Sequence, residues 1–401
     1  MDLEHSHWRN TLRILWIGNF IVGMGYQLIM PFMSLYIEEL GHYNSQQLSM
    51  WSGLVFGATF LVSSWMAPIW GRFADHHGRK KVMLIAACGM GTMMALMGTV
   101  HHVQQLVLLR LLQGFFSGYV SNASALMAAN VPVEHSGKAL SLLATGTTGG
   151  MLFGPLIGGT IANHFGYRLP FFLTGCAYAI VFTLVFFFIK EDNFKPIPKG
   201  ETRSIREVFA TLSYPKVIFG MMVTTLIIQA SNNSISPIIS LYVKELLKGN
   251  QNVAFMSGLV AALPGIATLI AAPIFGSLGD KYGPQKVLVA GLTFAILIFI
   301  PQAFVTNIWQ LAVLRFLVGI SDAALLPQVQ TMLAKYGSSR YSGRIFSYNQ
   351  SFQFVGNIIG PLIGSTISSL FGYSGVFIST ATLVLINLLW VKRVTCELTH
   401  S

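Results

Sequence analysis

The ten residues PFMSLYIEEL at positions 31–40 return as PIISLYVKEL at 237–246, with six of the ten letters unchanged. Further matches follow in the same order at the same offset of 205–206 residues: SGL (52–54) with SGL (257–259), APIWGRFADHHG (67–78) with APIFGSLGDKYG (272–283), Arg110 and Gly114 with Arg315 and Gly319, and GPLIGG (154–159) with GPLIGS (360–365). Ordered matches at one offset indicate an internal duplication. We therefore predict two similar halves, at 1–190 and 216–401, joined by the polar stretch 191–215 as a cytoplasmic linker.

Apolar stretches alternate with short polar loops along the whole chain. Only 10% of the 401 residues are charged, against roughly 25% in an ordinary soluble protein. About 20 apolar residues in a helix cross a ~30 Å hydrocarbon core, where lipid offers the backbone no hydrogen-bond partner. Twelve such spans are predicted, at 11–36, 48–70, 82–100, 104–129, 138–162, 169–190, 216–243, 252–275, 287–305, 308–333, 342–367 and 373–391. We predict an all-α membrane protein with twelve transmembrane helices.

Six spans per half is an even number, so both halves enter the membrane with the same orientation, as two parallel six-helix repeats. With both termini in the cytoplasm, twenty of the 25 Lys and Arg residues fall on the cytoplasmic side and three on the opposite side. This asymmetry follows the positive-inside rule. The net charge of +11 is spread over short loops, so we expect the lipid bilayer as a partner and no nucleic acid.

The loop between the second and third spans reads GRFADHHGRKK at 71–81, and its glycines permit a tight turn. A carboxylate in this loop can accept hydrogen bonds from a helix N-terminus, and Asp75 can pair with Arg79. The second copy keeps Gly276, Asp280 and Gly283 but replaces Arg-Lys-Lys with Pro-Gln-Lys at 284–286.

Two further motifs lie inside spans. The fourth span carries Arg110-Leu-Leu-Gln113-Gly114, where a buried guanidinium is costly. The fifth span carries glycines at spacings of four residues and ends in GPLIGG (154–159), whose small residues let helices approach closely.

These motifs, with MWSGLVF (50–56), VTTLIIQ (223–229) and GRIFSYNQSF (343–352), resemble the major facilitator superfamily over the whole chain. Within it, they resemble the twelve-span drug:proton antiporters of the bacterial inner membrane. The resemblance implies a monomeric multidrug efflux transporter, of a kind that confers antibiotic resistance. Such a protein exchanges protons for small drug-like molecules by alternating access, with the proton gradient as energy source and no cofactor.

The resemblance also implies roles for the motif residues. These are a conformational latch at Gly71, Asp75, Gly78, Arg79, Lys80 and, in a weaker second copy, Asp280; proton coupling at Arg110 and Gln113; and helix packing at Gly146, Gly150, Gly154, Pro155, Gly158 and Gly159, with Gly360 and Pro361 in the second half. The alternatives are an ordinary tight loop whose basic residues fix the topology, and a structural arginine in the fourth span.

Asp322 is the only carboxylate inside a predicted span, and it shares a helix face with Arg315 seven residues earlier. In the first half Ser117 takes the equivalent place. A carboxylate removed from water binds a proton more readily, so Asp322 with Arg315 is a candidate proton or cation site. The alternative is a structural salt-bridge partner buried between helices.

Amide side chains form two stripes with helical spacing, Gln229, Asn232 and Asn233 in the seventh span and Asn349, Gln353 and Asn357 in the eleventh. Because amides cannot face lipid cheaply, they face the protein interior. We predict that they line a substrate cavity, and bridging between helices is the alternative.

The sequence does not indicate an enzyme, because it shows no nucleophile–base pair and no G-K-[ST] phosphate loop. Its cysteines and histidines lack the spacing of metal ligands, so no metal site is predicted. The transport direction comes from the resemblance alone. The alternative function is therefore proton-coupled symport of a sugar or another small metabolite.

Overall fold

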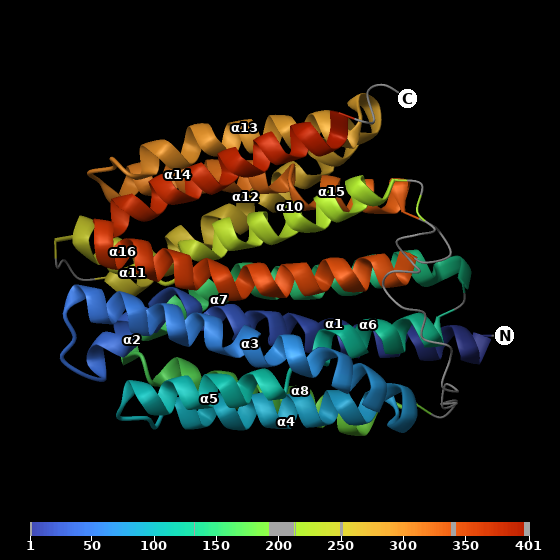
Figure 1. The fold of residues 1–401 in the computed structure, drawn as a ribbon. Helices are drawn as coiled ribbons and strands as arrows, with labels where there is room; N and C mark the ends of the chain where they lie inside the picture. The colour runs from blue at the N-terminus through green and yellow to red at the C-terminus, as the bar shows by residue number, and fades with distance from the viewer. Residues whose placement is uncertain are drawn as a thin grey trace. The chain divides into compact units, whose positions relative to one another are not determined.

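The computed structural model describes residues 2–131, 133–191, 212, 214–248, 252–337 and 342–396. Of the predicted linker 191–215, all but residues 191, 212, 214 and 215 lie outside the described part. Within the described part, every regular element is a helix (Figure 1). The helices form two compact units: residues 1–42, 61–200 and 252–262 form unit 1, and residues 43–60, 201–251 and 263–401 form unit 2. Two long helices, in the second and eighth predicted spans, therefore contribute to both units.

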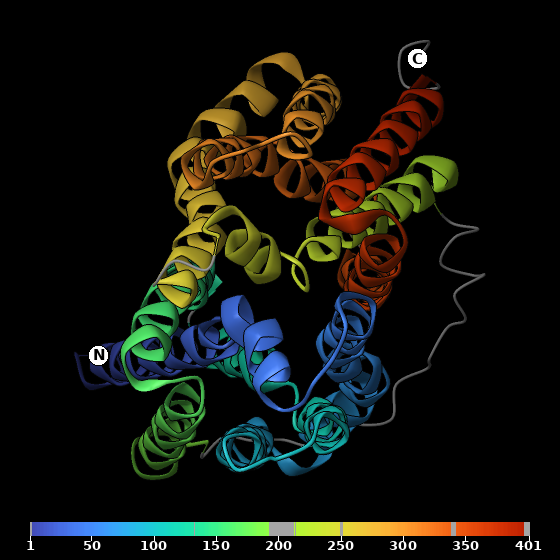
Figure 2. The ribbon, with the colours of Figure 1, turned by 90° about the vertical axis from the view of Figure 1, so that its left-hand side faces the viewer.

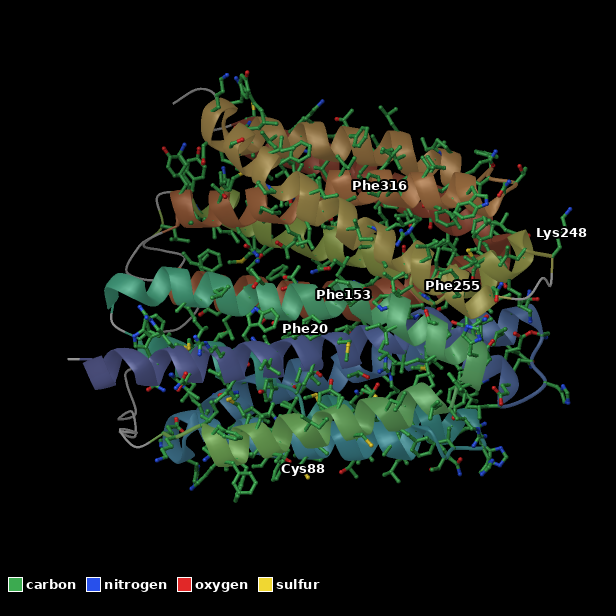
Figure 3. All side chains as sticks on the ribbon, turned by 180° about the vertical axis from the view of Figure 1, so that it is seen from behind. Phe20, Cys88, Phe153, Lys248, Phe255 and Phe316 are labelled. Atoms are coloured by element: carbon green, nitrogen blue, oxygen red, sulfur yellow. The ribbon has the colours of Figure 1, made fainter. Side chains whose placement is uncertain are left out.

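Unit 1 contains most of the helices of the first half. Its elements are α1 (Asp2–Leu28), the 3-10 turn η1 (Met30–Phe32), α2 (Met33–Glu39), the second part of α3 (Ser45–His77), α4 (Arg79–Met97), α5 (Val103–Phe115), α6 (Tyr119–Asn130), α7 (Val133–Phe165), α8 (Leu169–Phe188) and the start of α12 (Val253–Tyr282). α1 packs along α7, and α4 packs along α8. Figure 3 labels Phe20 on α1 and Phe153 on α7, whose ring centroids lie 6.3 Å apart.

Unit 2 contains most of the helices of the second half. Its elements are the first part of α3, α10 (Pro215–Ser234), α11 (Ile239–Leu246), the rest of α12, α13 (Pro284–Gln302), α14 (Ile308–Ala323), α15 (Leu326–Tyr336) and α16 (Ser342–Thr395). α16 runs through both the eleventh and the twelfth predicted spans. Gly372 interrupts it with φ 72° and ψ −178°, a backbone conformation that residues other than glycine rarely adopt.

The first span of each half is broken at the same place in the repeat. α1 ends at Leu28 and the chain resumes as α2 at Met33, while α10 ends at Ser234 and α11 begins at Ile239 (Figure 2). Pro31 and Pro237 occupy equivalent positions in the two breaks. Proline lacks the backbone N–H of a continuous helix and its ring clashes with the preceding turn, so the repeat itself carries the cause of both breaks.

Glycines hold the first span of unit 1 against the fifth. Gly146, Gly150, Gly154 and Gly158 follow one another at every fourth position of α7 and all face the backbone of α1. A Cβ added at Gly146 or Gly154 would lie 2.7 Å from the carbonyl oxygen of Trp16 or Met24, respectively. The two helix backbones are therefore too close for any side chain between them.

The end of the same motif meets α12. A Cβ at Gly159 would lie 2.6 Å from the carbonyl oxygen of Ala254, and a Cβ at Gly258 would meet the carbonyl group of Pro155. Both α12 residues belong to unit 1. The predicted packing residues at 154–159 thus contact two different helices.

Unit 2 repeats the arrangement between α10 and α16. A Cβ at Gly356 would lie 2.5 Å from the carbonyl oxygen of Leu226, and one at Gly360 would lie 2.6 Å from that of Ala230. The carbonyl oxygen of Pro361 lies 2.9 Å from the position of a Cβ at Gly53, in the part of α3 that belongs to unit 2.

Eight helical stretches of the described part are long and apolar enough to cross a membrane, and the last of them holds two predicted spans. The other predicted spans, 104–129, 138–162 and 216–243, are also helical, as α5 with α6, α7, and α10 with α11. Large apolar side chains lie on the outside, including Trp65, Phe165 and Phe371, each at least 70% exposed. Such a surface is expected where lipid is the solvent. The prediction of an all-α membrane protein is confirmed.

Candidate functional site

The carboxylate of Asp322 is hydrogen-bonded to an amide from another helix. Asp322 lies one residue before the end of α14, and Nδ2 of Asn232 on α10 donates to its Oδ1 at 3.0 Å. Arg315 is its charged neighbour, two turns earlier on α14. The Nε of Arg315 is buried and has no hydrogen-bond partner among the described residues. The predicted pair therefore shares one helix face, and the direct partner of the carboxylate is Asn232.

The amide stripes of α10 and α16 meet each other. Nδ2 of Asn233 donates to Oδ1 of Asn357 at 3.0 Å, and two turns earlier the Thr225 hydroxyl donates to Oδ1 of Asn349 at 2.8 Å. Gly356 and Gly360, which let the two helices approach, lie among these pairs. Polar bonds and close glycine contacts thus alternate along one helix interface.

The remaining amides of the stripes, Gln229 and Gln353, are partly exposed. The side-chain stem of Gln229 packs against Gly356: a Cβ at the glycine would lie 2.8 Å from the Cβ of Gln229. Four of the six predicted cavity residues are hydrogen-bonded to another helix, as the bridging alternative expects. Asn232, Asn233 and Asn357 are partly exposed like Gln229 and Gln353, so for these five residues the lining of a cavity stays a prediction.

Arg110 lies in unit 1 and is completely buried. Its Nη1 donates to Oε1 of Gln113, one turn later on α5, at 2.9 Å, and its Nη2 lies 3.7 Å from the sulfur of Met30. Tyr26 on α1 and Tyr178 on α8 lie within electrostatic range of the guanidinium. The predicted pair Arg110–Gln113 is thus a hydrogen-bonded unit, held at the break after α1.

The loop motif is built around a helix N-terminus that a carboxylate caps. α4 begins at Arg79, and the backbone N–H groups of Arg79 and Lys80 both donate to the carboxylate of Glu191, at 2.9 Å each. Gly78 precedes them with φ 93°, and a Cβ there would lie 2.7 Å from Oε2 of Glu191. Glycine is therefore required both by the backbone conformation and by the bound carboxylate.

The basic side chains of the motif also bond within unit 1. The Arg79 guanidinium donates to the carbonyl oxygen of Ala125 on α6, and the Lys80 ammonium donates to that of Phe186 on α8 at 2.9 Å. Asp75 belongs to the last turn of α3, and its side chain lies outside the described part. A Cβ at Gly71 would meet nothing within 4 Å, so packing does not require this glycine.

The second copy of the loop cannot hold a carboxylate in the same way. Gly283 has φ 92°, close to the value at Gly78, but α13 then begins with Pro284, which has no backbone N–H to donate. Asp280 is exposed near the end of α12. Pro284 takes the place of Arg79 in the repeat. The second copy therefore lacks the first of the two backbone N–H donors that bind Glu191 in the first copy.

Sequence reasoning did not find Glu191 or Thr225, nor two equivalent hydroxyl bridges. The Ser63 hydroxyl donates to the carbonyl oxygen of Gly114 at 3.2 Å in unit 1, and the Thr268 hydroxyl donates to that of Gly319 at 2.8 Å in unit 2. The repeat offset carried a usable signal for the bridges, because 63 and 268, and 114 and 319, each differ by 205.

No group of three or more His, Cys, Asp or Glu residues that could hold a metal ion occurs among the residues that were described. The candidate site is built from the Asp322 carboxylate, the Arg110 and Arg315 guanidinium groups, and neighbouring amides and hydroxyls.

Comparison with known proteins finds relatives that match almost the whole chain. A family model for the Major Facilitator Superfamily matches residues 15–257 and 221–395. Multidrug resistance protein MdtG of Dickeya zeae (strain Ech586) is 49% identical over 386 residues, which cover 96% of this chain and 94% of the relative. Multidrug resistance protein MdtG of Salmonella typhi is 47% identical over 384 residues, covering 96% and 95%.

Solved structures share the fold at low sequence identity. A bacterial homolog of the human lysosomal transporter Spinster, in an inward-facing and unoccupied conformation, superposes with a TM-score of 0.81 at 15% identity and 97% coverage of both chains. The human organic anion transporter MFSD10 (TETRAN) superposes with a TM-score of 0.71 at 15% identity, covering 96% of this chain and 99% of that one.

Proposed function

The chain belongs to the major facilitator superfamily and, within it, to the MdtG-type multidrug resistance proteins, and from that premise we propose that it exports small amphiphilic drugs or toxicants by proton antiport. It is a multi-pass membrane transporter and not an enzyme. The observation that carries the proposed coupling is the Asp322 carboxylate inside a membrane-spanning helix, bonded to an amide of a second helix.

The proposed proton carrier is Asp322, with Arg315 as the cation that favours its charged form. A carboxylate in a low-dielectric site can alternate between charged and neutral forms at modest cost when its donors move. Arg110 and Gln113 form the polar centre of the other half and are proposed to take part in coupling there. The loop at 71–80 is proposed as the latch that must open between the states.

One proton per cycle is sufficient to drive useful export. A charge crossing about 150 mV gains roughly 3.4 kcal/mol, at ~2.3 kcal/mol per 100 mV. At ~1.4 kcal/mol per tenfold gradient, this sustains about two and a half decades of cargo concentration. No cofactor is required, because the proton gradient supplies the energy.

The cargo is proposed to contact the partly exposed amides of α10 and α16. Gln229 and Gln353 offer donors and acceptors without a fixed charge, which suits loose selection of amphiphilic molecules over tight recognition of one metabolite. The protein is proposed to act as a monomer in the bacterial inner membrane with both termini in the cytoplasm. The excess of basic residues on that side supports this orientation.

The test measures accumulation of ethidium in cells that express the chain, with the Asp322→Asn variant expressed to the same level as control. We expect less intracellular dye with the parental protein and loss of the difference after addition of an uncoupler. A resistance profile against unrelated antibiotics then identifies further cargo. Raised accumulation of solutes that depends on the proton gradient would contradict export and favour the symport alternative.

A further inference from the structure

Three consecutive residues at the end of α10 bond to three different places in unit 2. Asn232 donates to Asp322 on α14, Asn233 donates to Asn357 in the first part of α16, and the hydroxyl of Ser234 lies 2.8 Å from that of Thr380 in the second part of α16. These three residues connect the candidate proton carrier on α14 with both parts of α16. The end of α10 is therefore the junction between the candidate proton carrier and the candidate cargo helices.

The junction lies where α10 ends and not in the middle of a helix. α10 stops at Ser234, and the chain resumes as α11 only at Ile239, so the last turn is not continued by helix hydrogen bonds. A Cβ at Gly364 would meet the carbonyl group of Ser234, so the last turn rests directly on the α16 backbone. Discontinuous membrane helices place such ends at binding and coupling sites.

The chemistry of the bond makes it sensitive to charge. Nδ2 of Asn232 is a donor and has no lone pair to accept with, so its bond to Oδ1 stabilises the charged carboxylate. Arg315 is the charged group that acts on Asp322. Other charged residues of the helices packed around α14 and α10 lie near helix ends: Lys216, Asp280, Lys281, Lys286, Lys335, Arg344, Lys392 and Arg393.

We propose that Asn232 is a positioning residue for Asp322, holding the carboxylate charged while the end of α10 is docked and releasing it for protonation when α10 moves. Because Asn233 is tied to α16, displacement of that helix by cargo is passed to Asp322 through adjacent residues. This assigns Asn232 to proton coupling and not to the lining of the cavity. The inference rests on the proposed function, with Asp322 as proton carrier.

The test measures protonation directly in the purified full-length protein. Dicyclohexylcarbodiimide modifies protonated carboxyl groups in apolar surroundings, and mass spectrometry reports the modification at Asp322 at each pH between about 5 and 9. Losing one charge-assisted hydrogen bond moves the half-labelling point of Asn232→Ala upward by about one pH unit. Asn232→Leu, which keeps the volume, shows the same shift and serves if the alanine variant does not fold.

Thr224→Val is the matched control, because it removes a buried hydroxyl of α10 that bonds within the same helix, to the carbonyl oxygen of Gly220, and not to Asp322 or α16. Its half-labelling point stays at the parental value. An unchanged point in both Asn232 variants, or an equal shift in Thr224→Val, overturns the assignment. Labelling of the parental Asp322 that does not vary with pH, judged against Asp322→Asn as the blank, contradicts the proton site itself and so separates the two failures.

Discussion

The glycines of α7 predict a sharp contrast between two positions of this helix, Gly154 and Gly149. A Cβ at Gly154 would lie 2.7 Å from the carbonyl oxygen of Met24, about 0.7 Å short of the 3.4 Å at which ordinary contact begins. A Cβ at Gly149 would lie 3.5 Å from the ring of Phe20, which is ordinary contact. Gly154→Ala must therefore push α1 and α7 apart, whereas Gly149→Ala fits in place.

The two changes are expected to affect the free energy of unfolding differently. Overpacking costs about 1–3 kcal/mol, and replacing glycine by alanine in a helix returns up to about 1 kcal/mol. Gly154→Ala is expected to be destabilising by roughly 1–2 kcal/mol, and Gly149→Ala to be neutral or stabilising.

The assay is the midpoint of thermal unfolding of each purified variant in the same detergent. We expect the midpoint of Gly154→Ala to fall below that of the parental protein and that of Gly149→Ala to equal or exceed it. Gly360→Ala, where a Cβ would lie 2.6 Å from the carbonyl oxygen of Ala230, is expected to repeat the loss in unit 2. Equal midpoints for Gly149→Ala and Gly154→Ala would refute the close approach of the two backbones.

Three further outcomes are expected. Asp322→Asn removes the carboxylate that is proposed to carry the proton, so the steady-state dye gradient across everted membrane vesicles falls by about two decades, while uncoupled exchange of dye persists. A gradient equal to that of the parental protein would exclude Asp322 as proton carrier. Glu191→Gln weakens the cap on the backbone N–H groups of Arg79 and Lys80 and lowers the unfolding midpoint by an amount equivalent to about 1 kcal/mol. The control Glu39→Gln, at an exposed carboxylate, leaves the midpoint unchanged. Equal effects of the two variants would show that the cap does not stabilise the protein. Thr268→Val deletes the bridge to Gly319 and costs about 1 kcal/mol by the same measurement, and no loss would show that the bridge adds nothing.

The span pattern could be predicted because it depends on composition summed over twenty residues. The helix breaks after Leu28 and Ser234 were not predicted, although Pro31 and Pro237 stand in the very segments that revealed the repeat. The residues around Pro31 are apolar, so a search for apolar stretches runs through the first break. Before Pro237 the polar residues Asn232, Asn233 and Ser234 interrupt the apolar stretch, but the helical spacing of the amides predicts a polar face of one continuous span. Proline chemistry would have located both breaks without the structure.

The partners of the site residues could not be predicted, because helix periodicity assigns a face and not a neighbour. Asn232 and Asn233 belong to one stripe, yet one bonds to α14 and the other to α16. The loop shows the same limit. The sequence offered Asp75 as the carboxylate for a helix N-terminus, and the structure places Glu191, more than a hundred residues along the chain, at the start of α4. Only tertiary contacts supply that pairing.

The matched features of the two halves also record the history of the chain. The proline breaks, the glycine rows and the hydroxyl bridges at Ser63 and Thr268 occur in both halves, so they date from a six-helix ancestor that existed before the gene was duplicated. Two copies of that ancestor, inserted in the same direction, would have had to pair as a homodimer. The Asn232–Asp322 bond occurs in the second half, and Ser117 takes the place of Asp322 in the first half, so this bond marks a difference that two halves joined in one chain can keep.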